Sequence, residues 1–364
     1  TVRNTCGRIG AVALLGLALA LSGCAATPPA QKTKIGVLLP DDEAGPRWEQ
    51  TDELALENEF KGNDFAYEPN IETASTPKEA TDTATTMINE GAKVLVFAAP
   101  DREVETAITT TAKARGIPTV GYDLTDSPTL STSNSAATTA DYVITTDYHT
   151  VGEITGRGIV RGVRTKPDAT VIQLTSGPTR DAATQITEGQ RNILAPRYDR
   201  HLYRLIATEQ VNPADTRAIT TTLTRLLDTH GGRVDAVLTA NDTVAQAAIT
   251  VLRQRGLAGK TTVTGYGAHT ETLKAILRGD QFSTGYTPPA AQATAAATLA
   301  KALADGDRAR ADQLTLPGQP RRLLLAPTTH TLTDLSKIFN DGIADSDDVC
   351  DPTLELRCNQ LSIP

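Results

Sequence analysis

The feature that most restricts the fold of this chain is a regular alternation of short β-rich runs with amphipathic segments from Lys32 onward. Strand, helix and strand at this spacing indicate parallel sheets with right-handed crossovers. The second helix has a clear start signal, because Thr76, Pro77 and Glu79 have the spacing of a capping box with proline at the first helical position. The first four β-rich runs are KIGVLLP, FAYEPNI, KVLVFAA and IPTVGYD, with the first helix expected over 46–60.

The same rhythm then restarts, and no low-complexity linker separates the two blocks. The second block predicts the strands YVITTD, ATVIQLT, LYRLIAT, VDAVLTA and TTVTGYG, separated by helices near 149–164, 181–195, 213–230, 242–256 and 270–279. A chain of this length exceeds what one hydrophobic core usually serves. The sequence therefore predicts an α/β protein with two Rossmann-like, doubly wound parallel-sheet domains.

The amino-terminal residues predict export. Arg3 and Arg8 precede an apolar run from Ile9 to Leu21 that is too short to span a bilayer but typical of a signal peptide. The run ends in LSGC, which resembles the bacterial lipobox. The expectation is a signal peptide over 1–23, a lipid-modified Cys24, and a linker over 24–33 that leaves the protein anchored in the membrane through lipid.

Charge and cysteine content narrow the function. The formal charge is −8, and −10 once Arg3 and Arg8 are removed, which argues against nucleic acid as a partner. Cys350 and Cys358 are expected to form a disulfide in an exported protein. Their spacing matches no common zinc pattern, and the five histidines are scattered singly, so neither a metal nor a cofactor is expected.

Ligands of doubly wound sheets bind beyond the carboxyl ends of the strands. The side chains that follow predicted strands are therefore expected to line a cleft between the domains. These residues are Trp48, Tyr122, Asp123, Arg180, Asp181, Asn241, Asp242 and Tyr266.

Five segments are similar to type I periplasmic sugar-binding proteins of ABC importers, and most of all to their xylose-binding members. The similarity runs from about Lys34 to Ala344. It implies three strand crossings at a hinge, near 142–147, 283–288 and 322–327, and a bound ligand that undergoes no chemistry. The expected domains are 34–142 with 288–322, and 143–287 with 323–345, followed by a tail over 346–364. The segments are KIGVLLPDDEAGPRWEQTDE, INEGAKVLVFAAPD, AKARGIPTVGYD, VDAVLTANDTVAQAAITVLRQRGLAGKTTVTGYGA and FSTGYTPP.

The resemblance assigns ligand-binding roles to four residues. Arg47 and Trp48 match an arginine–tryptophan pair that supplies fork-shaped donors and an aromatic face for the sugar ring. Asp123 matches a carboxylate that accepts from two hydroxyls, and Asn241 matches an amide ligand. The alternatives are that Trp48 packs under its helix with Arg47 solvated, and that Asp123 is a helix N-cap or turn carboxylate. Asp242 is expected to cap the following helix.

The chain also departs from the xylose-binding pattern. Leu124 replaces an arginine, Gly267 an aspartate and Thr287 a lysine, while Arg180 and Asp181 replace an aspartate–asparagine pair. Each change removes or alters a polar partner, so the ligand is not expected to be simply xylose. Arg180 either reaches the ligand from the second domain or pairs with Asp181 or Asp123.

These observations predict a monomeric solute-binding lipoprotein, not an enzyme, at the outer face of the cell membrane. It would capture a sugar or sugar derivative through Arg47, Trp48, Asp123, Arg180 and Asp181 together with Asn241, and deliver it to an ABC permease. The alternative is an envelope sensor or docking lipoprotein that has kept the receptor body but has a degenerate sugar site.

Overall fold

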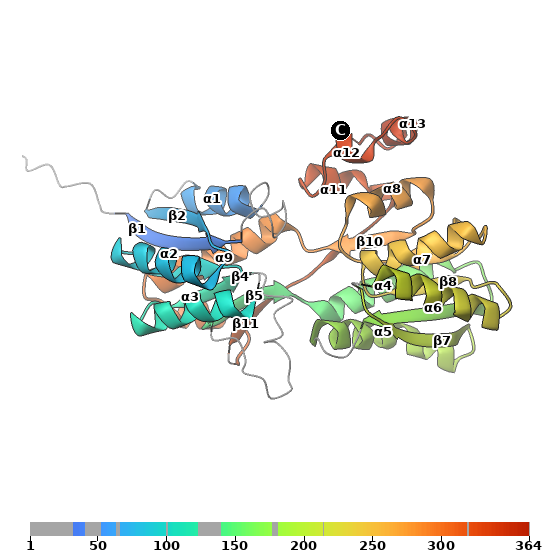
Figure 1. Ribbon diagram of the computed structural model, residues 1–364, viewed down its shortest axis with the longest axis horizontal. Coiled ribbons are helices and arrows are strands. Elements are labelled where there is room, and N and C mark those ends of the chain that lie inside the picture. The colour runs from blue at the N-terminus through green and yellow to red at the C-terminus, as the bar shows by residue number, and fades with distance from the viewer. Residues whose placement is uncertain are drawn as a thin grey trace, which may run out of the picture. The chain divides into compact units, whose positions relative to one another are not determined.

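The computed structural model describes residues 32–40, 52–62, 66–99, 101–122, 140–176, 181–213, 215–318 and 320–363, with only the backbone of Asp181. Two six-stranded sheets organise this part of the chain (Figure 1). Among the described helices, none is both long and apolar enough to cross a membrane.

The first sheet has the strand order β11-β5-β4-β3-β1-β2, and all of its pairs are parallel. Its central strands are buried and rich in Val, Ile and Leu because helices cover both faces, whereas the two edge strands are partly exposed. The strands are β1 (Thr33–Leu39), β2 (Tyr67–Thr73), β3 (Leu95–Phe97), β4 (Thr119–Tyr122), β5 (Tyr142–Thr146) and β11 (Arg321–Leu325).

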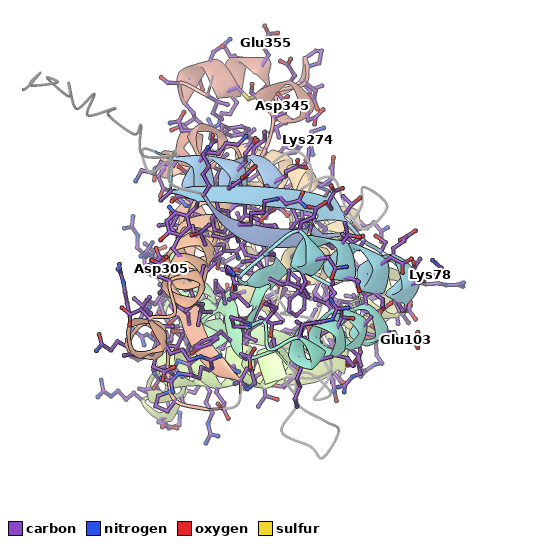
Figure 2. All side chains as sticks on the ribbon, turned by 90° about the vertical axis from the view of Figure 1, so that its left-hand side faces the viewer. Lys78, Glu103, Lys274, Asp305, Asp345 and Glu355 are labelled. Atoms are coloured by element: carbon purple, nitrogen blue, oxygen red, sulfur yellow. A yellow bond between two sulfur atoms is a disulfide. The ribbon has the colours of Figure 1, made fainter. Side chains whose placement is uncertain are left out.

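Five helices pack on the first sheet. One face is covered by α1 (Glu53–Lys61), α9 (Pro289–Ala304) and α10 (Arg308–Gln313). The other is covered by α2 (Pro77–Asn89) and α3 (Arg102–Ala114). Figure 2 shows Lys78 and Glu103 on the outer side of α2 and α3, opposite the apolar faces that these helices bury.

The second sheet repeats this arrangement in the order β12-β10-β9-β8-β6-β7, and only its edge strand β12 is antiparallel. Helices α6 and α7 cover one face, and α4 and α5 cover the other. The strands are β6 (Ala169–Ser176), β7 (Tyr203–Val211), β8 (Ala236–Thr239), β9 (Thr262–Thr264), β10 (Ser283–Tyr286) and β12 (Thr328–Thr331). The helices are α4 (Tyr148–Gly162), α5 (Asp181–Asp199), α6 (Thr216–Thr229), α7 (Asp242–Gln254) and α8 (Thr270–Arg278).

The chain passes between the two sheets three times, after β5, after β10 and after β11. The first two crossings touch, because the hydroxyl oxygens of Thr146 and Thr287 lie 2.9 Å apart. The first and third also touch, since the Asp147 amide donates to the Leu325 carbonyl at 2.9 Å. The predicted class, two doubly wound α/β domains joined by a three-strand hinge, is confirmed, whereas the domain limits given above stay predictions.

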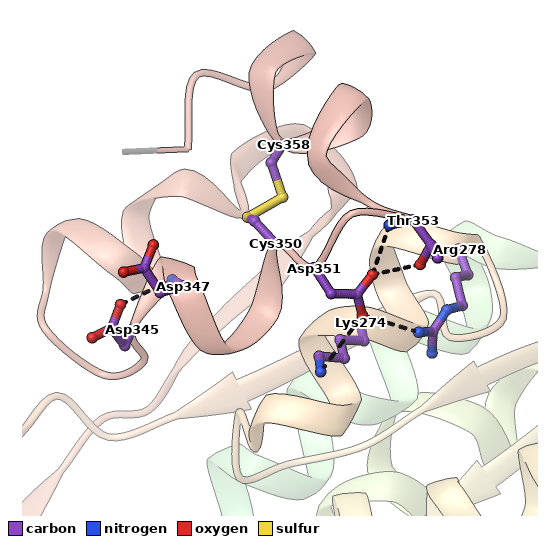
Figure 3. Close-up of a disulfide and its surroundings, with 8 residues drawn as sticks. All are labelled: Lys274, Arg278, Asp345, Asp347, Cys350, Asp351, Thr353 and Cys358. Carbon is purple, nitrogen blue, oxygen red and sulfur yellow. Dashed lines mark hydrogen bonds and ion pairs between the residues drawn. A yellow bond between two sulfur atoms is a disulfide. The ribbon is translucent and has the colours of Figure 1, made fainter.

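The residues that follow β12 pack on α8 and form a separate apolar cluster with it. After β12 come a 3-10 turn, η4 (Leu332–Asp334), and three short helices, α11 (Ser336–Asn340), α12 (Ser346–Val349) and α13 (Glu355–Gln360). Their apolar side chains surround Tyr286 of β10. A disulfide joins Cys350 to Cys358, and Asp351 lies beside Lys274 and Arg278 of α8 (Figure 3).

Local signals at the start of the chain's second helix are also confirmed. Thr76 caps α2 by accepting from the Glu79 amide, the Glu79 carboxylate accepts from the Thr76 amide, and Pro77 is the first helical residue. The two amides that face out of the helix end are thereby satisfied.

Helices α4 and α5 approach each other through glycines. A Cβ atom on Gly152 would lie 2.0 Å from the Ile186 carbonyl oxygen, and one on Gly189 would lie 2.0 Å from the His149 carbonyl oxygen. No side chain can be accommodated at that distance without moving a helix backbone. This contact fixes α5, which begins at the carboxyl end of β6, against α4, which begins at the first crossing.

We expect Gly189→Ala to lower the free energy of unfolding by about 1–3 kcal/mol, because the added methyl must push the two helices apart. Gly156→Ala in α4 is the matched control. Its Cβ would lie 3.1 Å from the Ile193 Cβ and 3.5 Å from the Gln190 carbonyl oxygen, so α5 must give by only a few tenths of an ångström. Because replacing a helical glycine also gains up to about 1 kcal/mol, we expect a much smaller loss than for Gly189→Ala. Urea unfolding of both variants tests the contact, and equal stability of Gly189→Ala and wild type would contradict it.

Candidate ligand-binding site

The carboxyl edge of the second sheet is the part of the expected site that the structure describes best. Asn241 and Tyr266 follow β8 and β9 at this edge, as predicted. Arg47, Trp48, Asp123, Leu124 and Arg180 lie outside the described residues. Asp181 is the first residue of α5, and its side chain is likewise outside the description.

Asn241, and not Asp242, caps α7, so the predicted capping role of Asp242 is wrong. Asn241 has the extended backbone of a cap residue, with φ −156° and ψ 173°, and its Oδ1 accepts from the Val244 amide at 3.0 Å. Asp242 is already helical and its side chain turns inward. Among the described residues the half-buried Asn241 Nδ2 has no hydrogen-bond partner, so this amide keeps two donors for a ligand.

The Asp242 carboxyl group is completely buried, with 0% of the residue exposed. Its Oδ1 accepts from Gln281 Nε2 at 3.0 Å, and its Oδ2 accepts from the Thr284 hydroxyl at 2.8 Å. Burial raises the pKa of Asp242, while hydrogen bonds from Thr284 and Gln281 and the nearby His269 oppose the rise. Asp242 therefore supports the edge of the sheet from beneath and does not face a ligand.

Tyr266 takes part in a chain of hydroxyl groups that reaches the hinge. Its phenol oxygen lies 2.9 Å from the Thr287 hydroxyl, which in turn lies 2.9 Å from that of Thr146. Both threonines are buried at the starts of the first two crossings: Thr146 is the last residue of β5 and Thr287 directly follows β10. Where the resemblance leads one to expect a lysine, the chain thus has a neutral hydroxyl that bridges two others.

A second tyrosine, Tyr148, lies near Tyr266, and the sequence analysis missed it. Both half-buried rings pack on one small apolar cluster, formed by Val151, Ile186 and Ala240. Ala240 directly precedes Asn241, so an amide and two aromatic rings lie together at this edge. Its place just after β5 could have predicted this position, because residues that follow a strand lie at the carboxyl edge of the sheet.

The prediction that Tyr122 lines the cleft is wrong, whereas backbone geometry explains the glycine at position 267. Tyr122 does not line a cleft: it is 0% exposed in the core of the first domain, and its hydroxyl donates to Asp52 Oδ1 at 2.6 Å. Gly267, which stands where the resemblance has an aspartate, has φ +139°, and a Cβ there would lie 2.9 Å from His269 Nε2. The local backbone therefore requires glycine at 267.

Within the described ranges, no group of three or more His, Cys, Asp or Glu side chains could hold a metal ion.

The Asp147 carboxylate at the first crossing is occupied by contacts inside the protein, since it caps α4 by accepting from the Thr150 amide and hydroxyl. The described edge of the second sheet thus offers an amide, hydroxyls and aromatic faces. Such groups suit a small, neutral, polyhydroxylated ligand better than a charged one.

Two doubly wound sheets joined by three crossings, with these groups at a carboxyl edge, define a two-domain α/β binding protein. A family model described as "Periplasmic binding protein domain" matches residues 35–308. The chain therefore belongs to the periplasmic binding protein family, with the type I fold, and is a binding protein, not an enzyme.

Individual relatives agree with this assignment. The D-xylose-binding periplasmic protein of Escherichia coli (strain K12) is 27% identical over 317 residues, covering 86% of this chain and 91% of the relative. The Haemophilus influenzae protein of the same name is 26% identical over 302 residues, covering 82% and 86%. A carbohydrate transporter solute binding protein from Chloroflexus aurantiacus, solved with D-glucose, has a TM-score of 0.63 at 18% identity, covering 87% of this chain and 98% of that one.

Two aspartates that flank β8 should affect stability with opposite dependence on pH. A carboxyl group whose pKa is raised on folding, as for Asp242, costs stability as the pH rises from its ordinary value of 3.8 through the raised pKa. For Asp235, desolvation would raise the pKa, but hydrogen bonds from Thr170 and Lys166 outweigh it and lower the pKa. Its contribution is present above 3.8 and lost as the pH falls.

We therefore expect the free energy of unfolding of wild type, relative to Asp242→Asn, to decrease as the pH rises above 3.8, the ordinary pKa of the carboxyl group. Relative to Asp235→Asn it should instead increase as the pH rises from about 3 to 5. Urea unfolding at each pH measures both differences. Parallel profiles for wild type and Asp242→Asn would show that Asp242 has an ordinary pKa in the folded protein.

Proposed function

We propose that this protein is a membrane-anchored solute-binding lipoprotein that captures a sugar or sugar derivative between its two domains and delivers it to an ABC permease. The geometry of Asn241 carries this proposal: the helix uses the amide oxygen, and the amide donors remain available at the carboxyl edge of the sheet. The aromatic rings of Tyr148 and Tyr266 beside it add the flat apolar faces against which a sugar ring packs.

The rest of the site is drawn from residues outside the described part of the chain. Arg47, Trp48 and Asp123 would hold the ligand from the first domain, and Arg180 with Asp181 would complete the site from the second. The naming of both curated relatives as D-xylose binders supports a monosaccharide-sized ligand. Ligand binding would favour the closed form only to the extent that this form binds the ligand more tightly than the open form.

Ligand binding is expected to be measurable through the only tryptophan of the chain, Trp48, and through thermal stability. At one hundred times its dissociation constant, a ligand should add about 2.7 kcal/mol to the free energy of unfolding. D-xylose, D-glucose, myo-inositol and sugar acids form the panel. If none of them shifts the unfolding curve or the fluorescence, the docking or sensor alternative replaces the transport proposal.

Substitutions of Asn241 separate its two roles. Asn241→Ser keeps a capping oxygen but removes the amide donors, so we expect affinity for the sugar to fall about tenfold with little change in stability. Asn241→Ala should lose the same affinity and also about 1 kcal/mol of stability. Asp307→Ala is the matched control, because it removes the cap of α10, far along the chain from the site, and should leave affinity unchanged. Calorimetric titration measures the affinity of the three variants, and urea unfolding measures their stability.

The lipid anchor rests on the LSGC sequence and Cys24. In the native cell, the full-length protein should incorporate a palmitate analogue, and Cys24→Ala should abolish the label and release the protein from the membrane fraction. Cys6→Ala is the control and should be labelled normally, since Cys6 lies within the predicted signal peptide. Labelling that persists in Cys24→Ala would exclude the proposed anchor.

A further inference from the structure

The loop Gly265–His269, which carries Tyr266, lies directly on the buried Asp242 carboxylate. A Cβ at Gly265 would lie 2.1 Å from Asp242 Oδ1, and one at Gly267 would lie 3.4 Å from Oδ2. No atom fits between this loop and the carboxylate. The shape of the loop is therefore tied to the position of a single acidic group.

Hydrogen bonds also tie the backbone of this loop to Asp242 and its partners. The Asp242 amide donates to the Tyr266 carbonyl at 2.9 Å. The Ala268 amide donates at 3.2 Å to the Thr284 hydroxyl, which itself donates to Asp242 Oδ2. Gly267 is fixed as well, since its amide donates to the Gly285 carbonyl at 2.7 Å.

The loop needs this support because its backbone is in an unfavourable conformation. Ala268 has φ 53°, in the left-handed region that non-glycine residues seldom adopt. Such conformations persist only where the surrounding structure determines them fully, and they concentrate at functional sites. Gln281 completes the support, because its Nε2 donates to both Asp242 Oδ1 and the Ser283 carbonyl.

We propose that Asp242 is a positioning residue for ligand recognition. It aligns Tyr266 with the Thr287 hydroxyl at the hinge, and because it directly follows Asn241 in the chain, it also fixes Asn241 at the edge of the sheet. Asp242 does not touch the ligand. Its effect on affinity is transmitted through the loop and the Tyr266 hydroxyl. This inference rests on the proposed sugar-binding function.

Asp235 provides a matched comparison on the same strand. It directly precedes β8, as Asp242 closely follows it, and its Oδ2 accepts from the amide and hydroxyl of Thr170, each at 2.9 Å. Both aspartates therefore tie neighbouring segments through a threonine. Asp235 does so at the amino edge of the sheet, away from Tyr266, so the same substitution there controls for a purely structural effect.

The test is a double-mutant cycle of Asp242→Asn and Tyr266→Phe, with affinity for the best-bound sugar of the panel measured by calorimetry. We expect Asp242→Asn to weaken binding about tenfold, and the double variant to bind no more weakly than the weaker single variant, because both changes act through one contact. Asp235→Asn should bind like wild type. Amide hydrogen exchange at Gly267 and Ala268, followed by NMR, should accelerate in Asp242→Asn but not in Asp235→Asn.

Unchanged affinity in Asp242→Asn, additive effects in the cycle, or unchanged exchange at Ala268 would each overturn the inference while the proposed function stands. A wild-type protein that binds no sugar would instead overturn the proposed function, and this inference with it. If Asp242→Asn does not fold, Thr284→Val serves in its place, since it keeps the carboxylate but removes the hydroxyl between Asp242 and Ala268. It should weaken binding and accelerate exchange in the same way.

Discussion

Parallel pairing of the strands brings every helix start and loop that could recognise a ligand to one edge of each sheet. In a parallel ladder all carboxyl ends lie on the same side, and right-handed crossovers return the chain to the opposite side each time. In the second domain this pairing places the end of β8, with Asn241, beside the end of β9, with Tyr266. The Thr287 hydroxyl then joins this edge to the hinge. None of these contacts could form if one central strand were reversed.

The aspartates at the two edges of the sheets differ in burial: Asp141 is exposed and Asp235 half-buried, whereas Asp242 is fully buried. At the amino edge, Asp235 binds the start of β6 through Thr170, and Asp141 binds the start of β4 through Thr119 in the same way in the first domain. The backbone at this edge is also strained, since Asp168 before β6 and His201 before β7 have φ 55° and 54°. At the carboxyl edge, Asp242 is fully buried and Ala268 adopts a left-handed backbone. What distinguishes the carboxyl edge is the fully desolvated carboxyl group of Asp242, on the side where ligands of doubly wound sheets bind.

The sequence predicts architecture better than side-chain roles. Periodicity and the capping signal at Thr76 are local, so the strand–helix order and the start of α2 could be predicted from neighbouring residues alone. Tyr122 and Asp242 could not. Both follow or end a strand at the expected place, but their orientation depends on partners far along the chain, Asp52 for Tyr122 and Thr284 for Asp242. Asn241 was assigned to the ligand from the resemblance; its capping of α7 was not expected, and its contact with a ligand stays a prediction.

The contact between the first two crossings joins two neutral hydroxyl groups, and this determines how much free energy is needed to break it. A hydroxyl–hydroxyl hydrogen bond such as Thr146 to Thr287 contributes about 1 kcal/mol net. Breaking a buried ion pair at the same place would cost about 3–5 kcal/mol. A ligand shifts the crossings only through the difference between its affinities for the two arrangements, and about 1 kcal/mol corresponds to a roughly fivefold difference. A hinge built from threonine and tyrosine hydroxyls would therefore need only a small preference of the ligand for one arrangement, whereas a charged hinge would require a ligand able to replace the lost charge partner.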